Sequence, residues 1–266
     1  MINPRLIFAA VLCAGLAACG PAAVATPTAP PVQAPTVAPT QTATPTPTPT
    51  EAPTAAQSPA PTPALTVAPS SVLLPRSGPL SPGSYYIADT GTTSVQRVTF
   101  TVPAGWVTAD YGFLSKDEGT SGEVSLNTWV LTHVFVDACK WDEAKIVDVG
   151  TTPAQLMAAL ADQKSREASP AQTVDFAGYP AQQMVLTVAP DLDVSTCTDG
   201  NLRYWPGPGP DFSSGLCCNP AGNIDTVYAV DVNGKRLVVV ARHYPGSSAA
   251  NIAELQGIVD SMQIQP

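Results

Sequence analysis

The chain has 266 residues and a formal net charge of −9, from 21 acidic and 12 basic side chains. An acidic surface repels phosphate groups, so this balance argues against nucleic acid as a partner and against electrostatic docking on anionic lipid. The composition changes sharply along the chain and divides it into three segments.

The N-terminal segment has the layout of a secretory signal. Arg5 precedes an uncharged apolar run from Leu6 to Ala18. A basic start followed by a short apolar run is typical of export signals. The run is shorter than the roughly 20 residues that a membrane-crossing helix needs. We therefore expect residues 1–18 to be a signal peptide, removed on export, and not a permanent transmembrane helix.

The apolar run ends in Leu16-Ala17-Ala18-Cys19-Gly20. This string resembles the bacterial lipobox, in which the cysteine is diacylated and becomes the mature N-terminus. The resemblance implies that Cys19 carries the lipid and that the membrane is a partner only through this anchor. Each inserted methylene contributes about 0.8 kcal/mol, so two acyl chains hold a protein stably. The alternative is an ordinary signal peptide with a chance cysteine near its cleavage site.

The segment from Pro21 to Val72 is dominated by Pro, Thr, Ala and Val, and Glu51 is its only charge. A segment with so little large apolar surface cannot offset the entropy lost on ordering its backbone. Frequent proline favours an extended polyproline II conformation. We expect residues 19–72 to be the lipidated cysteine followed by a disordered, semi-rigid Pro/Thr-rich tether, and residues 73–266 to form one globular domain.

Within this domain, six segments rich in β-branched and aromatic residues predict strands. They are Val95–Val102, Val124–Val136, Thr173–Phe176, Ala181–Val188 and the hairpin Thr226–Val232 with Lys235–Arg242. Asn233-Gly234 suits the type I′ turn of that hairpin. A second turn is predicted at Gly178-Tyr179-Pro180.

Two helices are predicted from their caps and apolar stripes. Thr152 before Pro153 caps a helix that reaches about Gln163. The second helix starts near Ser247 or Ser248, and its apolar residues at helical spacing are Ile252, Leu255, Val259 and Met262. Strands joined mainly by turns, together with two one-sided helices, indicate an α+β domain with an antiparallel sheet covered by helices.

Four short motifs carry a resemblance to a known fold. They are Phe100–Trp106, Thr173–Pro180, Arg236–Val240 and Val259–Met262. These motifs look like those of the PsbP-like fold, a group that includes the LpqN-type mycobacterial lipoproteins. The stretch from Leu73 onward resembles more closely uncharacterised envelope lipoproteins that have P-A-G-W, a D-x-C-x-W segment and a closing hairpin and helix. The resemblance implies a PsbP-like sandwich and a binding or scaffolding role in the cell envelope.

Four cysteines follow Cys19, namely Cys139, Cys197, Cys217 and Cys218. An even number of cysteines outside the cytoplasm indicates disulfides, and four cysteines allow three connectivities. The resemblance to the envelope lipoproteins implies a disulfide between Cys139 and Cys197. This pairing leaves Cys217 and Cys218 as a vicinal disulfide or as free thiols. The alternative joins the adjacent cysteines to the other two. A zinc site is disfavoured because the usual C-x-x-C spacing is missing.

Catalytic signatures are absent from the sequence. The only histidines, His133 and His243, fall in predicted strands, where a structural role is the usual one. No G-x-S-x-G elbow, H-E-x-x-H or phosphate-binding glycine loop occurs. We therefore expect a protein that is not an enzyme and has no cofactor and no metal.

The segment Pro190–Asn223 is long, and long connections without regular structure are often functional. It carries Tyr204 and Trp205, which we predict to be ligand-binding residues that stack on a sugar or peptide. The alternative is that they plug the edge of the sheet. The sequence thus predicts a monomeric, lipid-anchored binding module with an envelope protein or glycan as partner. The alternatives are an envelope hydrolase with an unrecognised site and a thiol-redox protein that uses Cys217 and Cys218.

The lipid anchor is tested by metabolic labelling of the producing cells with a palmitate analogue. We expect Cys19→Ala to abolish the label and to release the chain from the membrane fraction. Cys13→Ala is the matched control, since Cys13 lies in the discarded segment and its loss leaves the label unchanged. Continued labelling of the Cys19 variant would contradict the assignment.

Overall fold

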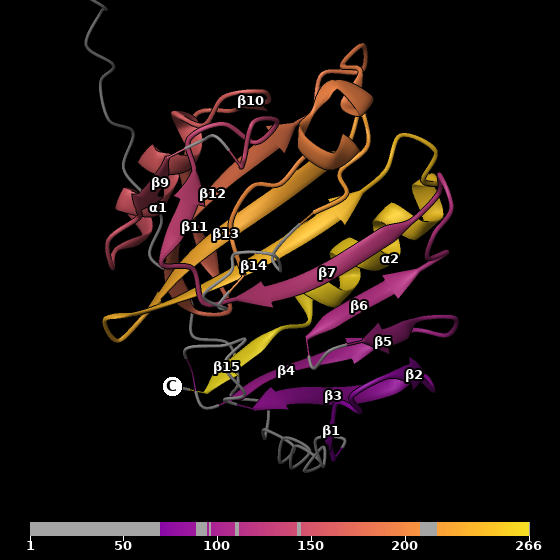
Figure 1. The fold of residues 1–266 in the computed structure, drawn as a ribbon. Helices are drawn as coiled ribbons and strands as arrows, with labels where there is room; N and C mark the ends of the chain where they lie inside the picture. The colour runs from indigo at the N-terminus through magenta and orange to yellow at the C-terminus, as the bar shows by residue number, and fades with distance from the viewer. Residues whose placement is uncertain are drawn as a thin grey trace, which may run out of the picture. The chain divides into compact units, whose positions relative to one another are not determined.

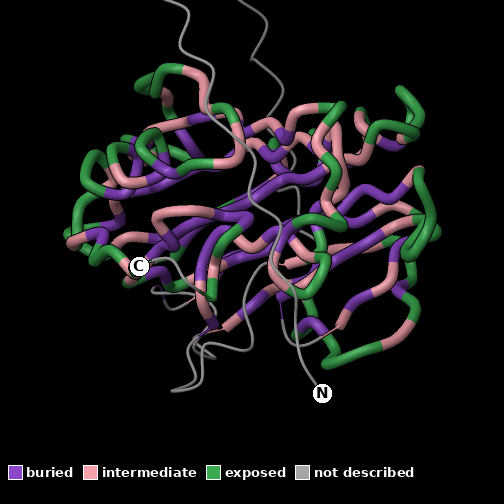
Figure 2. Tube along the Cα trace, turned by 45° about the horizontal axis from the view of Figure 1, so that its top comes forward, coloured by how far each residue is buried: buried purple, intermediate pink, exposed green. Residues whose placement is uncertain are grey.

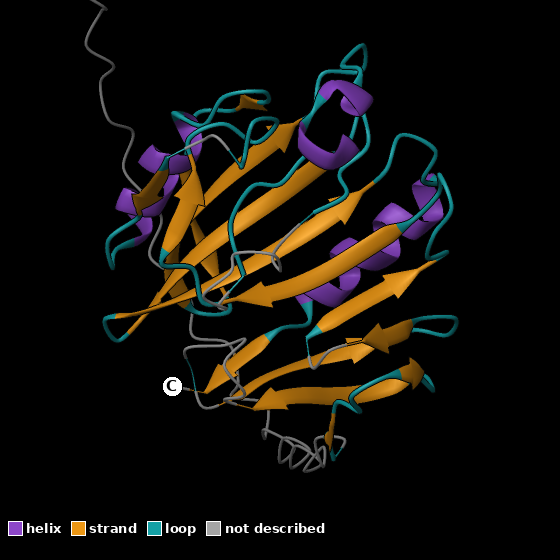
Figure 3. Ribbon diagram, in the orientation of Figure 1, coloured by secondary structure: helices purple, strands orange, loops and turns teal. Residues whose placement is uncertain are grey.

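A computed structural model describes residues 70–88, 95, 97–109, 112–142, 145–207 and 217–265. The predicted signal peptide, Cys19 and the tether up to residue 69 lie outside the described residues. The described chain is α+β, as predicted, with two α-helices packed against extensive β-sheet (Figure 3). Its first strand, β1, spans Val72–Leu73, at the predicted start of the globular domain.

The larger sheet has nine strands, and every pairing in it is antiparallel. In spatial order it contains β10 (Glu167–Ala168), β12 (Tyr179–Thr187), β13 (Ile224–Val232), β14 (Lys235–His243), β7 (Val124–Trp129), β6 (Phe113–Lys116), β5 (Val107–Ala109) and β2 (Gly78–Pro79). The ninth strand, β11 (Gln172–Phe176), pairs with β12 on the same side as β10. Figure 1 shows β13, β14 and β7 as the long central strands.

Two smaller sheets complete the strand structure of the described residues. One has the order β1, β3 (Gly83–Ala88), β4 (Arg97–Val102) and β15 (Gln263–Gln265). The other is the pair β8 (His133–Phe135) and β9 (Ile146–Asp148). Strand β15 follows the second helix directly and pairs with β4. The end of the described chain therefore returns to a strand near the start of the domain.

The hairpin of β13 and β14 is buried on both faces. Its residues alternate between two apolar clusters, because successive side chains of a strand point to opposite faces. Val227 and Val238 belong to one cluster, whereas Tyr228 and Val239 belong to the other. Figure 2 shows the buried residues following the strands while exposed residues concentrate in the connections. Asn233 and Gly234 join the strands with positive φ values of 55° and 82°, as the predicted type I′ turn requires.

Helix α2 (Ala249–Asp260) covers one face of the larger sheet, over β7 and β14, and also contacts β4. It begins at Ser248, whose hydroxyl accepts a hydrogen bond from the Asn251 N–H. Leu255, Val259 and the following Met262 are buried in the cluster on this face, as the apolar stripe predicted. We call this face the α2 face.

Helix α1 (Pro153–Ala161) packs on the opposite face, which we call the α1 face. Thr152 and Gln155 form a reciprocal capping box at its start. The helix ends at Ala161, before the predicted end at Gln163, and Gln163 makes tertiary contacts. Its side-chain amide is buried and donates to the carbonyl oxygens of Phe135 and Tyr204, at 2.6 and 2.5 Å.

The strand predicted over Val124–Val136 is wrong, because the structure divides it into β7 and β8. Arg236, far away in sequence, donates from its guanidinium to the backbone oxygens of Leu131 and Val149. Because the Leu131 carbonyl oxygen accepts a hydrogen bond from the Arg236 side chain, it points away from the backbone hydrogen bonds between neighbouring strands. The divided strand lets β8 pair with β9 instead of β14.

The turn predicted at Gly178-Tyr179-Pro180 is also displaced. The two turn residues are Ala177 and Gly178, with φ values of 54° and 84°, and Tyr179 already pairs with Phe176. A two-residue turn with two positive φ values is the type I′ hairpin connection. Strand β12 therefore begins at Tyr179.

No helix in the described part of the chain is long and apolar enough to cross a membrane.

The two-sided burial of β14 predicts that neighbouring residues support different cores. Val238 and Val239 are both fully buried but face opposite sides of the sheet. We expect Val238→Ala and Val239→Ala each to lower the free energy of unfolding by about 1–3 kcal/mol, because each removes buried methyl groups and leaves a cavity. Urea unfolding measures this. A single transition that shifts in both variants is expected, and two separate transitions would contradict a shared fold.

Candidate functional site

A groove of about 440 Å³ opens beside the C-terminal end of α2, where the edge hairpin of β11 and β12 meets that helix. Its floor is apolar and consists mainly of Phe176, Tyr228 and Val259, all buried. Its rim is polar and is formed by Asp175, Gln183, Gln256 and Asp260. We call this feature the α2 groove.

The sheet register explains why these residues meet. Gln183 of β12 lies directly opposite Tyr228 of β13, on the α2 face. Phe176 comes from the edge strand, and its ring centroid lies 4.9 Å from that of Tyr228 at a tilt of 49°. Because α2 ends at Asp260, its last turn presents Gln256 and Asp260 at a spacing of four residues. The groove is thus the part of the α2 face that the helix does not extend over.

Hydrogen bonds hold the rim in place. Gln256 donates from Nε2 to Oδ1 of Asp260 at 2.8 Å, and Asp175 accepts from the Gly178 N–H at 3.1 Å. Gln183 donates from Nε2 to the Tyr228 hydroxyl at 3.4 Å. Burial raises the pKa of Tyr228 above its ordinary value, so this hydroxyl is neutral near pH 7. An apolar floor with a few fixed polar groups is suited to binding.

The structure corrects the prediction that Tyr204 and Trp205 form an accessible stacking platform. Both side chains have 0% exposure and lie in the cluster on the α1 face. The Trp205 ring meets that of Trp129 edge-on with centroids 5.8 Å apart, and Arg166 lies over the Tyr204 ring. Burial raises the pKa of Tyr204, so it too is neutral. These aromatic residues fill the core beneath α1 and do not present a surface to a ligand.

The four cysteines of the domain form two pairs in the structure. Cys139 is joined to Cys197, the pairing that the family resemblance implies, with Cα atoms 4.6 Å apart. Further bonds tie the same two segments together, including the Thr198 N–H to the Cys139 carbonyl at 2.9 Å. Cys217 is joined to Cys218, whose side chain is exposed and whose φ is 67°.

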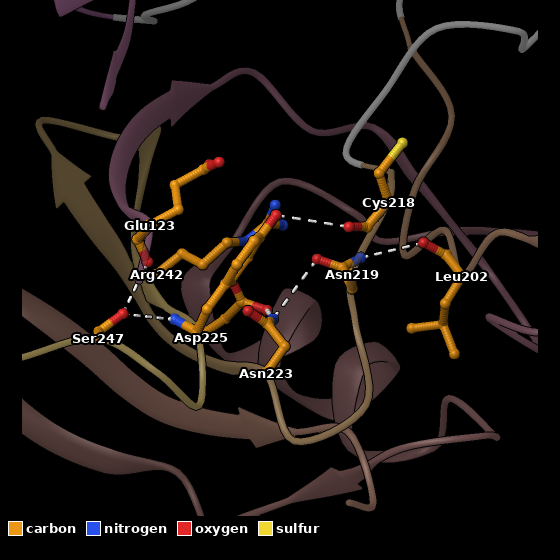
Figure 4. Close-up of polar contacts among 9 residues, drawn as sticks. Glu123, Leu202, Cys218, Asn219, Asn223, Asp225, Arg242 and Ser247 are labelled. Carbon is orange, nitrogen blue, oxygen red and sulfur yellow. Dashed lines mark hydrogen bonds and ion pairs between the residues drawn. The ribbon is translucent and has the colours of Figure 1, made fainter. Parts of the chain in front are cut away.

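A buried ion pair lies at the end of the central hairpin on the α1 face (Figure 4). Arg242 Nε lies 2.8 Å from Asp225 Oδ1, and the two side chains are 4% and 0% exposed. Burial alone would lower the pKa of Arg242, but the facing carboxylate raises it above its ordinary value. The predicted hairpin did not reveal this pair, because its first strand began at Thr226. The observed β13 begins at Ile224 and sets Asp225 opposite Arg242.

An amide chain connects this ion pair to the segment after Cys218. Asn223 donates from Nδ2 to Asp225 Oδ2 at 2.7 Å, and Asn219 donates from Nδ2 to the Leu202 carbonyl at 3.1 Å. Figure 4 shows Asn219 and Asn223 between Leu202 and the ion pair. These contacts anchor the chain on both sides of residues 208–216, and the ion pair serves structure.

The histidines belong to strands, as predicted. His133 begins β8, and its Nδ1 is hydrogen-bonded to the neighbouring Thr132 hydroxyl at 2.9 Å. His243 ends β14. Among the described residues, no group of three or more His, Cys, Asp or Glu side chains is placed to hold a metal ion.

No protein-family model and no curated protein sequence matches the chain. Among solved structures it is similar to LpqN of Mycobacterium tuberculosis, described as involved in cell envelope biogenesis, at 12% identity and a TM-score of 0.37, covering 69% of this chain and 91% of that one. It is also similar to CyanoP, the cyanobacterial PsbP of Synechocystis sp. PCC 6803, at 13% identity and a TM-score of 0.31, covering 68% and 92%. A Bacteroides thetaiotaomicron protein follows at 8% identity and a TM-score of 0.33, covering 70% and 50%.

LpqN and PsbP are the two kinds of protein that the sequence motifs resemble. Because all three TM-scores are below 0.5, these similarities give no information on function. The α+β class follows from the observed strands and helices.

The buried ion pair predicts a strongly non-additive response to mutation. We expect Arg242→Met alone to destabilise the fold by about 3–5 kcal/mol, because it leaves the Asp225 carboxylate buried without its cation. Adding Asp225→Leu should recover a large part of this loss, since the pair is then replaced by apolar side chains. Urea unfolding of the two single variants and the double variant measures the coupling. Additive losses would show that the two charges do not interact in the folded chain.

Proposed function

We propose that this chain is a lipid-anchored cell-envelope protein whose folded domain is a non-enzymatic binding module. The α2 groove is its binding site. The observation that carries the proposal is the groove itself, in which an apolar aromatic floor is surrounded by a small number of positioned polar groups. A groove of this composition offers a ligand hydrogen-bonding groups at its rim and a small apolar surface at its floor.

The anchor and the tether support an extracytoplasmic location. The string Leu16–Cys19 supplies the lipid attachment, and the Pro/Thr-rich segment that follows holds the domain at a distance from the bilayer. A domain on a stiff spacer can reach a partner in the surrounding envelope while it stays attached to its own membrane. A receptor or assembly factor needs such an arrangement, whereas a freely diffusing protein does not.

The groove favours binding over catalysis. A nucleophile requires a base within hydrogen-bond reach and donors for the developing charge. The groove is lined by carboxamides, carboxylates, a neutral Tyr228 and apolar side chains. Neither histidine is among its lining residues. Its carboxylates, Asp175 and Asp260, are exposed at the open rim.

Site-specific crosslinking in living cells tests the groove. A photoreactive amino acid replaces Gln256, which is exposed at the rim, and in a matched control replaces Lys235, which is exposed at the β13–β14 turn. We expect a crosslinked product at position 256 at several times the yield at position 235, because only the groove holds a ligand. Equal yields at the two positions would show that the groove is not the binding site. Turnover of an envelope substrate by the purified chain would overturn the non-enzymatic role.

The exposed position of Cys218 favours thiol redox exchange as a second candidate function. A surface disulfide of adjacent residues is accessible to an attacking thiolate from another protein. A redox role requires the pair to cycle between disulfide and dithiol in cells. Alkylation trapping of the chain from growing cells measures this, with Cys217→Ser as the control, and a pair that stays oxidised under all growth conditions would exclude the role.

A further inference from the structure

The strand next to the α2 groove has an open edge. Strand β11 is hydrogen-bonded only to β12, and no other described strand pairs with its outer side. Gln172, Thr173 and Asp175 are exposed along it. The strand contains neither the lysine nor the proline that often protects an edge. An open edge of this kind accepts an added strand.

The type I′ turn determines which backbone groups are available. In a two-residue hairpin the pair next to the turn is hydrogen-bonded, so Phe176 bonds to Tyr179 through both backbone groups. Hydrogen-bonded and non-hydrogen-bonded pairs alternate along an antiparallel ladder. The N–H and C=O groups of Thr173 and Asp175 therefore point away from β12, toward an added strand.

The α2 groove lies where the side chains of an added strand would point. Val174 and Phe176 line the groove from β11, and Gln183 and Tyr228 continue it across the sheet. Every second side chain of a strand faces the same side of a sheet. A peptide paired with β11 would thus place alternate side chains on the groove side of the sheet, next to Val174 and Phe176.

The charge at the rim selects the kind of peptide. Asp175 and Asp260 are exposed, and neither has an ion-pair partner among the described residues. A lysine or arginine beside Phe176 can lay its hydrocarbon stem on that ring and direct its charged end toward Asp260, which lines the same groove.

We propose that β11 and the α2 groove bind an extended, basic peptide segment of an envelope protein by strand addition. This inference rests on the proposed function, since it names the occupant of the same groove. The peptide backbone pairs with Thr173 and Asp175, and its basic side chains reach Asp260.

The probe is a fluorescein-labelled peptide of alternating lysine and valine, and its matched control carries glutamate in place of lysine. Binding to the full chain in mild detergent is measured by fluorescence anisotropy. We expect the lysine peptide to bind at least about tenfold more tightly than the glutamate peptide, because the rim is acidic. Asp260→Asn should weaken binding of the lysine peptide by about threefold to tenfold. Asp191→Asn, the same charge change at an exposed site outside the groove, should leave it unchanged.

Strand addition has its own test. Thr173→Pro removes one outward N–H without removing a backbone hydrogen bond to β12, and edge strands tolerate proline at such positions. It also removes the exposed side-chain hydrogen bond that the Thr173 hydroxyl accepts from Gln182, so Thr173→Val, which loses only that bond, is the matched control. We expect the proline variant to keep the unfolding curve of the control and to lose binding by about tenfold or more. N-methylation of alternate backbone nitrogens of the peptide should cause a similar loss while its charge is retained.

Three results would overturn the inference. They are equal binding of the two peptides, unchanged binding of the Thr173→Pro variant, and absence of binding of the lysine peptide up to about 1 mM. If crosslinking at position 256 still yields a product, only the identity of the occupant is wrong. If position 256 yields no product, the proposed function fails together with it.

Discussion

The central physical constraint of this fold is that the β13–β14 hairpin is buried on both faces. Val238 and Val239 are neighbours in sequence, yet each lies at 0% exposure in a different apolar cluster. A strand pair of this kind is stable only if each face receives a cover. Helix α2 and the small sheet of β3 and β4 cover one face, and α1 with the disulfide-linked segments covers the other. The location of the α2 groove follows, because α2 leaves the edge of its face uncovered.

Polar interactions at the end of the same hairpin fix the longest connection of the domain. The ion pair between Asp225 and Arg242 is shielded from water, so its attraction is strong but its desolvation is also costly. Its hydrogen bonds to Asn223, and those of Asn219 to Leu202, hold the segments before and after residues 208–216 against the sheet. The connection therefore contributes to the core on the α1 face, and the groove on the opposite face remains open.

Local signals in the sequence predicted what local physics determines. The turn Asn233-Gly234, the cap Thr152 and the stripe through Leu255 and Val259 all appear where they were expected, because each depends on neighbouring residues alone. The interruption after Trp129 depends on Arg236, more than a hundred residues away, and no local pattern encodes it. Tyr204 and Trp205 lie in a proline-rich context that indicates surface, yet α1 and β7 bury them. The groove was missed because helical spacing identifies Val259 as core and gives no information on where α2 ends relative to β11.

We propose that one sheet combines a permanent core in β13 and β14 with an interaction edge in β11. Backbone hydrogen exchange on the full chain, free and with the lysine–valine peptide added, tests this division of roles. The account predicts that the outward amides of Thr173 and Asp175 exchange rapidly in the free chain and become protected in the complex, while the amides of Val238 and Val239 stay protected in both. Unchanged exchange at Thr173 and Asp175 on binding would contradict it.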